Sequence, residues 1–371
     1  MNAWAGRLSF QACAIQGVVE GEPGCESAAA IGRAFGDVMC PQGDGRFVVG
    51  HDARQSSTSL AESLSVGLRS GGHHVTHIGR CTTPMLGWYG AEAGFDGSIM
   101  ITGSHLPPEY NGFKLCARDA LPVCAGLGLE EVASQMRLPF RFDRPCTSRV
   151  TRVDPMADYT SILRARLRGV SPMKLAVDAG NGVGGIDTRK VFEHFPHIWL
   201  HEINFNPDGR FPHRSPDPFA PGALRELSGC VLRHGCPFGL AFDGDADRAA
   251  VVDEQGRPVP AEEIGGLLAL GLVGSRPGAS IVHEPGVARP VLDALQQTGA
   301  VLQPVEGGQG FIRRAMQERE ALFGFDRSGR YYFADLHGTE NPLRALIELG
   351  RLLSERGGPL STLLEPLRRQ A

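Results

Sequence analysis

The sequence lacks the features that mark zinc-binding, disulfide-rich and membrane-spanning proteins. It has no Cys-x-x-Cys pair, and its nine cysteines are scattered along 371 residues. An odd count in a long chain predicts reduced thiols in a cytoplasmic protein, not a zinc site or a disulfide framework. The longest apolar run, residues 264–274, is too short to span a bilayer and follows two glutamates, so we expect a buried helix there.

A targeting segment and a strong charge of one sign are also missing. The first ten residues, "MNAWAGRLSF", lack a basic stretch followed by a long apolar one, so no signal peptide is expected. Lysine and arginine number 37 against 41 aspartates and glutamates, which gives a net charge of −4. This balance argues against nucleic-acid and membrane partners, but it is compatible with a local phosphate site.

What the sequence does contain is a repeated alternation of β-rich and helical segments. The first stretch predicts a strand at 46–52, a helix near 59–70 that stops at two glycines, and strands at 74–79 and 97–101. This order is typical of βαβ units, which build parallel or mixed sheets with helices on their faces. We therefore predict an α/β fold.

Two further stretches repeat this alternation and divide the chain. Residues 140–155 are basic, contain proline and have no helical period, so they mark a boundary. The alternation restarts near Met173 and again with a helix at 261–273. We expect three consecutive α/β domains with mixed sheets flanked by helices, at residues 1–148, 149–256 and 257–371.

Three aspartates alternate directly after the apolar run "FGLAF". They are Asp243, Asp245 and Asp247, and in an extended or looped backbone the side chains of residues i, i+2 and i+4 point the same way. Converging carboxylates repel one another unless a cation offsets their charge, and an all-oxygen ligand set suits Mg²⁺. A solvated acidic turn is the simpler alternative, which the strict alternation disfavours.

A calcium-binding EF-hand loop is a sharper alternative for the same segment. Glu254 lies at position twelve counted from Asp243, where such a loop has its last ligand. Position six must be glycine for the loop to turn, and this chain has Arg248 there. The flanking segments also read as strands, so we favour the magnesium interpretation.

A glycine-rich segment, "VDAGNGVGG", follows the first strand of the second domain. Gly180, Gly182 and Gly185 match the dinucleotide-binding pattern G-x-G-x-x-G, which is weak evidence when it stands alone. Asp178 and Asn181 favour a turn bonded by their side chains instead. We favour the turn and keep the dinucleotide site as the alternative.

Residues 101–114, "ITGSHLPPEYNGFK", interrupt an apolar strand with a polar segment that cannot be helical. Pro107 and Pro108 forbid a helix and stiffen the loop that begins at Ser104 and His105. The Asn-Gly pair that follows predicts a turn that brings Lys114 back toward the serine. A serine between a histidine and a lysine suits a nucleophile or a phosphate carrier, but a plain rigid loop explains this stretch equally well.

These two segments together resemble a known family. "TGSHLPPEYNGFK" is similar to the phosphoserine loop of the α-D-phosphohexomutases, the phosphomannomutase/phosphoglucomutase family, and "FDGDADR" is similar to their magnesium loop. "VVGHDAR" at 48–54 and "GRFPHRSPDP" at 209–218 also resemble family segments. The resemblance covers essentially the whole chain.

The resemblance implies a cytoplasmic isomerase of carbohydrate metabolism that interconverts hexose 1-phosphate and 6-phosphate, of mannose or glucose. Ser104 would carry a phosphoryl group, donate it to the sugar phosphate, and take back the other phosphate of the bisphosphate formed. His105 would assist proton movement, while Lys114 and Arg248 would stabilise phosphoryl oxygens. The active site would lie at the junction of the domains. Its Mg²⁺ ligands would be the Ser104 phosphate, Asp243, Asp245 and Asp247.

The parts that hold the sugar depart from the family's pattern. The loop "GFDRSGRYYF" resembles the sugar-recognition loop, with Asp326 in place of glutamate, Ser328 retained, and Arg330 in place of histidine. Arg313 stands where a lysine is expected. We expect these four residues to bind substrate.

Other expected substrate groups are replaced by uncharged ones. Gln16 stands in place of a phosphate-contacting arginine, Leu106 in place of an asparagine, Gln309 in place of a histidine and Gly286 in place of a sugar-binding lysine. The sequence given also ends at Ala371 without the fourth domain that the resemblance implies, so domain IV is expected to be absent unless the coding frame continues.

Three functions therefore stay open at this point. The first is a phosphohexomutase that is weak or has altered specificity. The second is a non-catalytic relative that binds a sugar phosphate or a partner, and the third is a phosphatase-like turnover of the phosphoserine. Retention of Ser104, His105, Lys114 and the aspartates favours chemistry.

Overall fold

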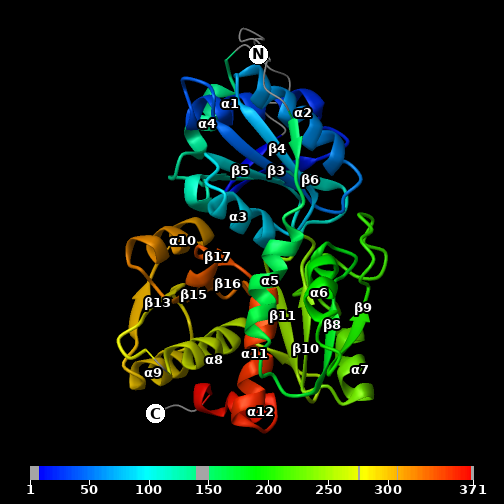
Figure 1. Ribbon diagram of the computed structural model, residues 1–371, viewed down its shortest axis with the longest axis vertical. Helices are drawn as coiled ribbons and strands as arrows, with labels where there is room; N and C mark the ends of the chain where they lie inside the picture. The colour runs from blue at the N-terminus through cyan, green and yellow to red at the C-terminus, as the bar shows by residue number, and fades with distance from the viewer. Residues whose placement is uncertain (1–7, 139–149, 275, 307, 369–371) are drawn as a thin grey trace. The chain divides into compact units, whose positions relative to one another are not determined.

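The structure is a computed structural model that describes residues 8–138, 150–274, 276–306 and 308–368 (Figure 1). It consists of two compact units. Unit 1 comprises residues up to Met156 together with Asp208–Arg210, and unit 2 comprises Ala157–Pro207 and the residues from Phe211 onward. Most of the predicted boundary segment 140–155 lies outside the described residues.

Seven described strands of unit 1 form one mixed sheet in the order β1-β2-β6-β5-β3-β4-β7. Strands β3, β4, β5 and β7 are mutually parallel where they pair, and β1, β2 and β6 run antiparallel to their neighbours. The strands are β1 (Ser9–Gln11), β2 (Ala14–Val18), β3 (Arg46–His51), β4 (His74–Arg80), β5 (Gly97–Ile101), β6 (Tyr110–Ala117) and β7 (Val150–Arg152). The helices are α1 (Cys25–Met39), α2 (Ser57–Ser70), α3 (Thr83–Glu92), α4 (Leu129–Gln135) and the short η1 (Arg118–Ala120).

Alternate residues of the central strands face different helices. Phe47 and Val49 of β3 pack into a hydrophobic cluster with α1, α2 and α4. Val48, between them, faces α3, where a side chain at Gly90 would lie 3.6 Å from it. Apolar residues on both faces are expected of strands covered by helices on both sides. The α/β prediction for this part of the chain is thus confirmed.

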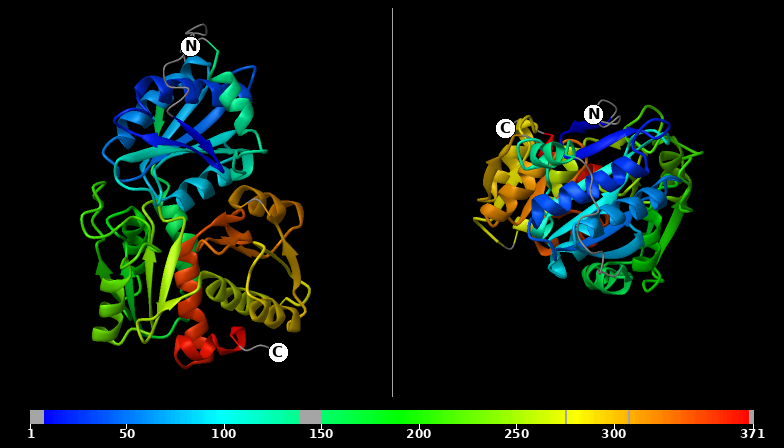
Figure 2. Two further views of the ribbon diagram at one scale, coloured as in Figure 1. Left: turned by 180° about the vertical axis from the view of Figure 1, so that it is seen from behind. Right: turned by 90° about the horizontal axis from the view of Figure 1, so that it is seen from above.

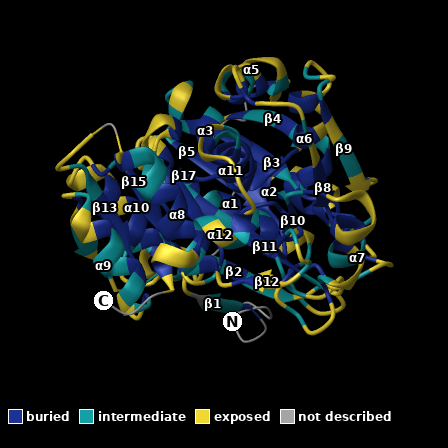
Figure 3. Ribbon diagram, turned by 90° about the horizontal axis from the view of Figure 1, so that it is seen from below, coloured by how far each residue is buried: buried dark blue, intermediate teal, exposed yellow. Residues whose placement is uncertain are grey.

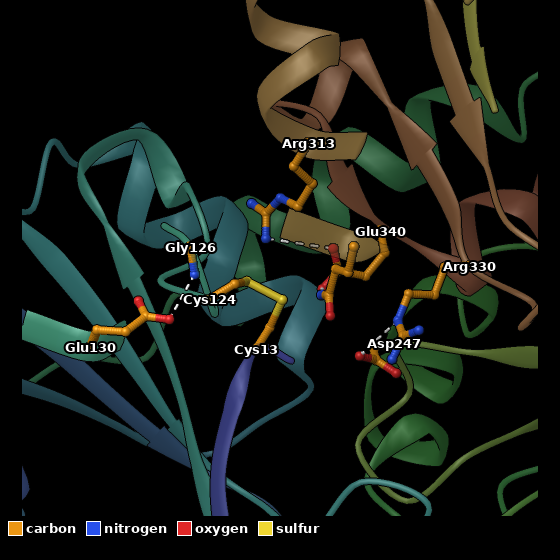
Figure 4. The surroundings of a disulfide bond; sticks show 9 residues. Cys13, Cys124, Gly126, Glu130, Asp247, Arg313, Arg330 and Glu340 are labelled. Atoms are coloured by element: carbon orange, nitrogen blue, oxygen red, sulfur yellow. Dashed lines mark hydrogen bonds and ion pairs between the residues drawn. A yellow bond between two sulfur atoms is a disulfide. The ribbon is translucent and has the colours of Figure 1, made fainter. Parts of the chain in front are cut away.

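The prediction of free thiols is wrong for one pair of cysteines. Cys13 and Cys124 form a disulfide, with their Cα atoms 4.0 Å apart and 111 residues between them in sequence (Figure 4). The backbone N–H of Ala125 donates to the carbonyl of Ala12, so the β1–β2 turn lies beside this loop. Sequence spacing carried no sign of that proximity. Six other described cysteines are free, and Cys146 lies outside the described residues.

Unit 2 contains two mixed sheets, the first in the order β12-β11-β10-β8-β9. Strands β8, β9 and β10 are parallel, while β10 and β11 form an antiparallel pair. The strands are β8 (Met173–Asp178), β9 (Ile198–Ile203), β10 (Phe238–Phe242), β11 (Ala249–Asp253) and β12 (Pro258–Val259), and the helices are α5 (Met156–Arg166), α6 (Gly184–Phe192) and α7 (Arg225–His234).

The second sheet of unit 2 has the order β14-β13-β15-β16-β17. Its strands are β13 (Ser280–His283), β14 (Val301–Pro304), β15 (Phe323–Phe325), β16 (Tyr331–Phe333) and β17 (Thr339–Glu340). Its helices are α8 (Ala261–Val273), α9 (Arg289–Gln297), α10 (Gln309–Glu318), α11 (Pro342–Arg356) and α12 (Leu360–Leu363), with short η2 (Ala334–Leu336) and η3 (Glu365–Leu367). Helix α8 coincides with the helix predicted at 261–273.

Helix α11 joins the two sheets of unit 2, and Figures 1 and 2 show it between them. Asn341 caps the helix, because its side-chain oxygen accepts from the N–H of Arg344 at 2.8 Å. Its amide also donates to Tyr159 Oη of α5 at 2.7 Å. A side chain at Gly350 would meet Met173 of β8. Unit 2 therefore has a shared, buried centre, which Figure 3 shows in dark blue at α8 and α11.

None of the helices in the described residues is both long and apolar enough to cross a bilayer. The apolar run at 264–274 instead lies largely in α8, where Ile264, Leu267 and Leu268 are buried. Its prediction as a buried helix is confirmed.

Candidate functional site

The Ser104 loop follows β5, and its backbone carbonyl groups are bound by a buried arginine. The Arg54 guanidinium donates to the carbonyl oxygens of Ser104, Leu106 and Pro107 at 3.0, 2.6 and 2.6 Å. Gly103 is required here, because a side chain at this position would lie 2.5 Å from the same guanidinium. Arginine suits this position because its rigid fork of donors can satisfy several acceptors at once.

Asp52 anchors the arginine and the strand end together. Its carboxylate accepts from Arg54 Nε at 3.1 Å, from Thr102 Oγ1 at 2.9 Å and from Ser57 Oγ at 2.6 Å. Thr102 Oγ1 in turn accepts from the Ser104 N–H at 2.7 Å. Ser104 itself has a φ of 49°, a left-handed conformation that non-glycine residues seldom adopt. Such strain persists only where surrounding contacts hold it, and it is common at functional sites.

Two side chains predicted to act with Ser104 lie in the same unit. The imidazole Nδ1 of His105 is 3.5 Å from Ser104 Oγ. Lys114 pairs with Met100 across β5 and β6, which places it on the face of the sheet that Thr102 also shares. The predicted turn at Asn111-Gly112 is wrong, because both residues lie inside β6 and pair with β2. The chain reverses earlier, where the Tyr110 N–H donates to the Pro107 carbonyl.

The three aspartates lie in the hairpin loop between β10 and β11. Their side chains are fully buried, and one carboxylate oxygen of each lies within 4.8 Å of the others. Asp243 shapes the loop by accepting from the N–H groups of Asp247 and Arg248 at 3.0 and 3.2 Å. Ala246 has a φ of 60°, a left-handed conformation that lets the chain reverse its direction within this short loop. The predicted convergence of Asp243, Asp245 and Asp247 is confirmed.

This arrangement fits Mg²⁺. The donor atoms are carboxylate oxygens, which hard divalent cations prefer, and they come together where water cannot screen their repulsion. A calcium-binding EF-hand does not fit, because β10 and β11 flank the loop. Glu254, the twelfth position, instead accepts from Ser361 Oγ and from its N–H.

The glycine-rich segment at 177–185 packs against this loop. A side chain at Gly182 would lie 2.6 Å from the carbonyl oxygen of Gly244, so only glycine permits the close approach. The Gly180 N–H donates to Asp178 Oδ1 at 2.7 Å, as expected for a side-chain-bonded turn. Arg214 joins the two segments by donating to Asp178 at 2.6 Å and to the Phe242 carbonyl at 2.7 Å. These contacts give the segment a packing role.

The predicted sugar-recognition loop is tied together by its own polar groups. Asp326 Oδ1 accepts from the hydroxyl and the N–H of Ser328 and from the Arg330 N–H, and Asp326 Oδ2 accepts from Tyr332 Oη at 3.0 Å. Arg330 donates through Nη1 to Ser328 Oγ at 2.8 Å. The carboxylate predicted to bind sugar is therefore already engaged within its own loop.

Arg330 also connects this loop to the aspartates. Its Nε lies 3.3 Å from Asp247 Oδ2 (Figure 4). Burial opposes the charge of the guanidinium, but Asp247 and then Asp326 outweigh it and raise the pKa of Arg330. Arg248 lies on the other side of the same carboxylate, with Nε 3.8 Å from Asp247 Oδ1. Two arginines thus offset part of the negative charge of the aspartates.

Arg313 of α10 pairs with a buried glutamate that the sequence did not single out. Its Nη1 lies 3.5 Å from Glu340 Oε2, and Gln309 Nε2 donates to Glu340 Oε1 at 2.8 Å (Figure 4). Burial raises the pKa of Glu340, while Arg313 opposes that rise and Asp247 adds to it. Nε and Nη2 of Arg313 are buried without a hydrogen-bond partner in the described residues.

The structure therefore brings together, within each unit, most of the residues that the sequence predicts. Ser104, His105 and Lys114 lie in unit 1, and the aspartates, Arg248, Arg313, Asp326, Ser328 and Arg330 lie in unit 2. Sequence reasoning missed Asp52, Arg54, Arg214 and Glu340, which position these groups. The available signals were that Asp52 and Arg54 fall within "VVGHDAR" and that Arg214 falls within "GRFPHRSPDP", two segments to which no role was assigned.

Comparison with known proteins shows that the chain is similar to one family along most of its length. Three family models match consecutive parts of the chain. They are described as "Phosphoglucomutase/phosphomannomutase, alpha/beta/alpha domain I" at residues 7–127, domain II at 156–256 and domain III at 260–370. A relative from Xanthomonas campestris pv. campestris, described as "Phosphohexose mutases", is 30% identical over 359 residues. The match covers 96% of this chain and 79% of that relative.

Solved structures show the same fold. A phosphoglucomutase/phosphomannomutase family protein from Burkholderia thailandensis has a TM-score of 0.88 at 28% identity, over 98% of this chain and 80% of that one. The Aspergillus fumigatus N-acetylphosphoglucosamine mutase, solved in complex with GlcNAc-6P and magnesium, has a TM-score of 0.55 at 15% identity. That match covers 86% of this chain and 65% of that one.

Proposed function

This chain belongs to the phosphoglucomutase/phosphomannomutase family, the α-D-phosphohexomutases, and we propose that it interconverts hexose 1-phosphate and hexose 6-phosphate through a phosphoserine at Ser104. The observation that carries the proposal is the convergence of three buried carboxylates in the family's magnesium loop. A buried cluster of like charges costs stability, and binding of a divalent cation relieves that cost. Mannose and glucose phosphates are the substrates we favour, and a cytoplasmic location stays a prediction.

The first half-reaction moves the phosphoryl group from Ser104 to the sugar phosphate. The bond between phosphorus and Ser104 Oγ breaks, a bond forms to the free sugar hydroxyl, and that hydroxyl's proton ends on the serine oxygen. His105 is the residue we assign to this proton movement, because its Nδ1 lies 3.5 Å from Ser104 Oγ. In the second half-reaction the bisphosphate, after turning over, returns its other phosphoryl group to Ser104 by the reverse sequence of bonds.

Cations would stabilise the transferring group. When bound by Asp243, Asp245 and Asp247, Mg²⁺ would offset charge on the phosphoryl oxygens, as metal ions do in phosphoryl transfer. The Ser104 phosphate as a further metal ligand is a prediction from the family resemblance. Lys114 and Arg248 are the side chains we assign to the phosphoryl oxygens.

Substrate binding is the least family-like part of the proposal. Arg313, Asp326, Ser328 and Arg330 remain the proposed substrate contacts, and sugar hydroxyls would have to displace the existing bonds of Asp326. Gln16 and Gly286, which stand in place of an expected arginine and lysine, favour a second candidate, a non-catalytic relative that binds a sugar phosphate or a partner. Slow hydrolysis of the phosphoserine is a third outcome that the same experiment detects.

Intact-protein mass spectrometry after incubation with glucose 1,6-bisphosphate and Mg²⁺ separates these functions. The proposed function requires that the wild-type chain gains one phosphoryl group and that Ser104→Ala gains none. Ser59→Ala, which changes an exposed serine of the same unit, serves as the matched control and should gain the group. Uptake followed by spontaneous loss indicates phosphatase-like turnover, and no uptake by the wild type overturns the proposal. Coupled assays with mannose 1-phosphate and glucose 1-phosphate then identify the sugar.

A further inference from the structure

A second cluster of metal-ligating side chains lies in unit 2, on elements other than the carboxylate loop. His201 comes from β9, the edge strand of the first sheet, and Cys230 and His234 come from α7. One ligand atom of each lies within 4.8 Å of the others. Cys230 and His234 are four residues apart on the helix, so their side chains share one face.

One member of this cluster carries a buried atom that needs a partner. The Nε2 of His201 is buried and has no hydrogen-bond partner among the residues that the structure describes. A buried polar atom without a partner is costly and calls for an explanation such as an unseen ion. The ring of His201 stacks on that of His234, with centroids 4.0 Å apart and an angle of 22° between the planes, so the exposed His234 ring has to turn before both imidazoles can direct a nitrogen at one ion. Cys230 is 5% exposed, whereas His234 is exposed, so the cluster reaches from the core to the surface.

Burial acts in opposite directions on the protonation of His201 and Cys230. Burial, then His234 and Lys174, lower the pKa of His201, which keeps its imidazole in the neutral form that binds metals. Burial raises the pKa of the Cys230 thiol, with Arg233 acting in the opposite direction. A metal that binds Cys230 as thiolate must therefore displace a proton, so its uptake should strengthen with rising pH.

The position on the helix also favours a cation. His234 is the last residue of α7, which ends at Gly235 in a left-handed conformation. The C-terminal end of a helix carries a partial negative charge. Lys174 of β8 already lies at this end of the helix, where its Nζ donates to the carbonyl of His234 at 3.1 Å. The positive charges of Lys174 and Arg233 oppose a second cation, and the thiolate of Cys230 would offset them.

We propose that His201, Cys230 and His234 form a second metal site that takes Zn²⁺ and ties β9 to α7. Two imidazoles and one thiolate are ligands that zinc prefers and that Mg²⁺ does not. The fourth position of a tetrahedral ion would face the surface beside His234 and would hold water or a small ligand. The site is independent of the proposed mutase activity, because none of its residues belongs to the carboxylate or serine loops.

Titration with Co²⁺ in the presence of excess Mg²⁺ tests this site directly. Cobalt bound by a thiolate absorbs by charge transfer in the near ultraviolet, whereas cobalt bound by carboxylates alone does not, so the aspartates stay silent. The experiment uses the full chain under anaerobic conditions, without a thiol reductant. We expect one equivalent of Co²⁺ to produce the absorption and Zn²⁺ to displace it.

Variants locate the ligands. Cys230→Ser should abolish the charge-transfer absorption, and His201→Ala and His234→Ala should each weaken Co²⁺ binding by at least about 10-fold, the loss seen even for residues that only support a ligand. His194→Ala removes an exposed histidine outside the cluster and should change nothing. Asp245→Ala should also keep the absorption. The site is refuted if the wild type shows no absorption at one equivalent or if Cys230→Ser retains it.

Thermal unfolding supplies a second readout that does not depend on cobalt spectra. Zn²⁺ bound across β9 and α7 should raise the melting temperature of the wild type in the presence of Mg²⁺. The same addition should leave the melting temperature of Cys230→Ser unchanged, while circular dichroism verifies that this variant is folded. An equal Zn²⁺-dependent rise in both proteins would contradict the proposed site.

Discussion

The Ser104 loop and the carboxylate loop are built in the same way around opposite charges. Each follows a fully buried strand, and each contains a non-glycine residue in the left-handed region, Ser104 at 49° and Ala246 at 60°. The serine loop closes over the buried cation of Arg54, which binds backbone carbonyls. The carboxylate loop closes over the buried anion of Asp243, which binds backbone N–H groups.

The charges around each loop determine whether the loop is suited to bind a cation. In the serine loop the buried charge is balanced by Asp52, so the loop is complete and presents one hydroxyl. In the carboxylate loop Asp243, Asp245 and Asp247 lie close together, and Arg248 and Arg330 lie 3.8 and 3.3 Å from Asp247. A cation bound by the three carboxylates would relieve their mutual repulsion and stabilise this loop.

The largest effect should come from removing the buried cation of the serine loop. Arg54→Met leaves Asp52 as a buried, unpaired carboxylate and three carbonyl groups without their donor. We expect the free energy of unfolding to fall by about 3–5 kcal/mol, as for other broken buried ion pairs. Urea unfolding followed by circular dichroism measures the change.

The exposed Arg80, at the end of β4, supplies the control. Arg80→Met should alter the free energy of unfolding by no more than about 0.5 kcal/mol. Equal stabilities of Arg54→Met and Arg80→Met would show that the serine loop does not depend on its buried charge.

The next effect concerns the carboxylate loop. Asp245→Asn keeps the shape of the side chain but removes one of three carboxylates. We expect the affinity for Mn²⁺, used as a spectroscopic substitute for Mg²⁺, to fall on the order of 100-fold, since ligand loss should cost at least as much as loss of a supporting residue. Electron paramagnetic resonance of free Mn²⁺ gives the affinity. Asp293→Asn on α9 is the matched control, and a similar loss there would point to nonspecific binding.

A smaller change of opposite sign should follow from removing a competing cation. Arg330→Gln removes the guanidinium whose Nε lies 3.3 Å from Asp247 Oδ2. The aspartates should then bind Mn²⁺ about 10-fold more tightly, a change in binding free energy equal to that of a shift of one pKa unit. The metal-free variant should also melt earlier than the wild type, because Asp247 and Asp326 lose their partner. Arg327→Gln, which changes the exposed arginine of the same loop, should leave Mn²⁺ affinity unchanged. Weaker binding in Arg330→Gln would mean that the arginine supports the site.

The smallest effect concerns a partly buried histidine of unit 1 that resists taking a positive charge. Burial, then Arg152 and His51, lower the pKa of His77 below its ordinary 6.5, and its Nε2 contacts Ser65 Oγ at 2.7 Å. The folded state therefore resists protonation of His77, so its contribution to stability is present above pH 6.5 and is lost as pH falls through the folded pKa.

Melting temperatures between pH 7.5 and 5, a span chosen around the ordinary histidine pKa of about 6.5, should decline more steeply for the wild type than for His77→Gln. His74→Gln on the same strand, where the side chain is half exposed, should follow the wild-type curve. Parallel curves for the wild type and His77→Gln would remove His77 from the account of acid sensitivity.

Local patterns were enough to predict the elements and the two loops. Alternation of Asp243, Asp245 and Asp247 after a buried strand was enough to predict that their side chains converge, although the loop is not extended and turns at Ala246, where φ is 60°. Proline at 107 and 108 excludes a helix after Ser104 for equally local reasons. The Asn-Gly pair misled because its turn propensity was overridden when β6 paired with β2 and β5.

Partners distant in sequence could not be predicted. Arg54 lies 50 residues before Ser104, and Cys13 lies 111 residues before Cys124. The His201 cluster escaped notice because only Cys230 and His234 are near each other in sequence, and the packing of α7 on β9 adds His201.

The sequence by itself determined the α/β fold, the presentation of Ser104 and the convergence of three carboxylates, because each depends on neighbours in the chain. Tertiary structure alone decided which charges balance these loops. Arg54 reaches the serine loop from the segment after β3, and Arg330 reaches Asp247 from the turn between β15 and β16. Electrostatic energy depends on distance in space, and distance in space between remote residues is set only when the sheets have formed.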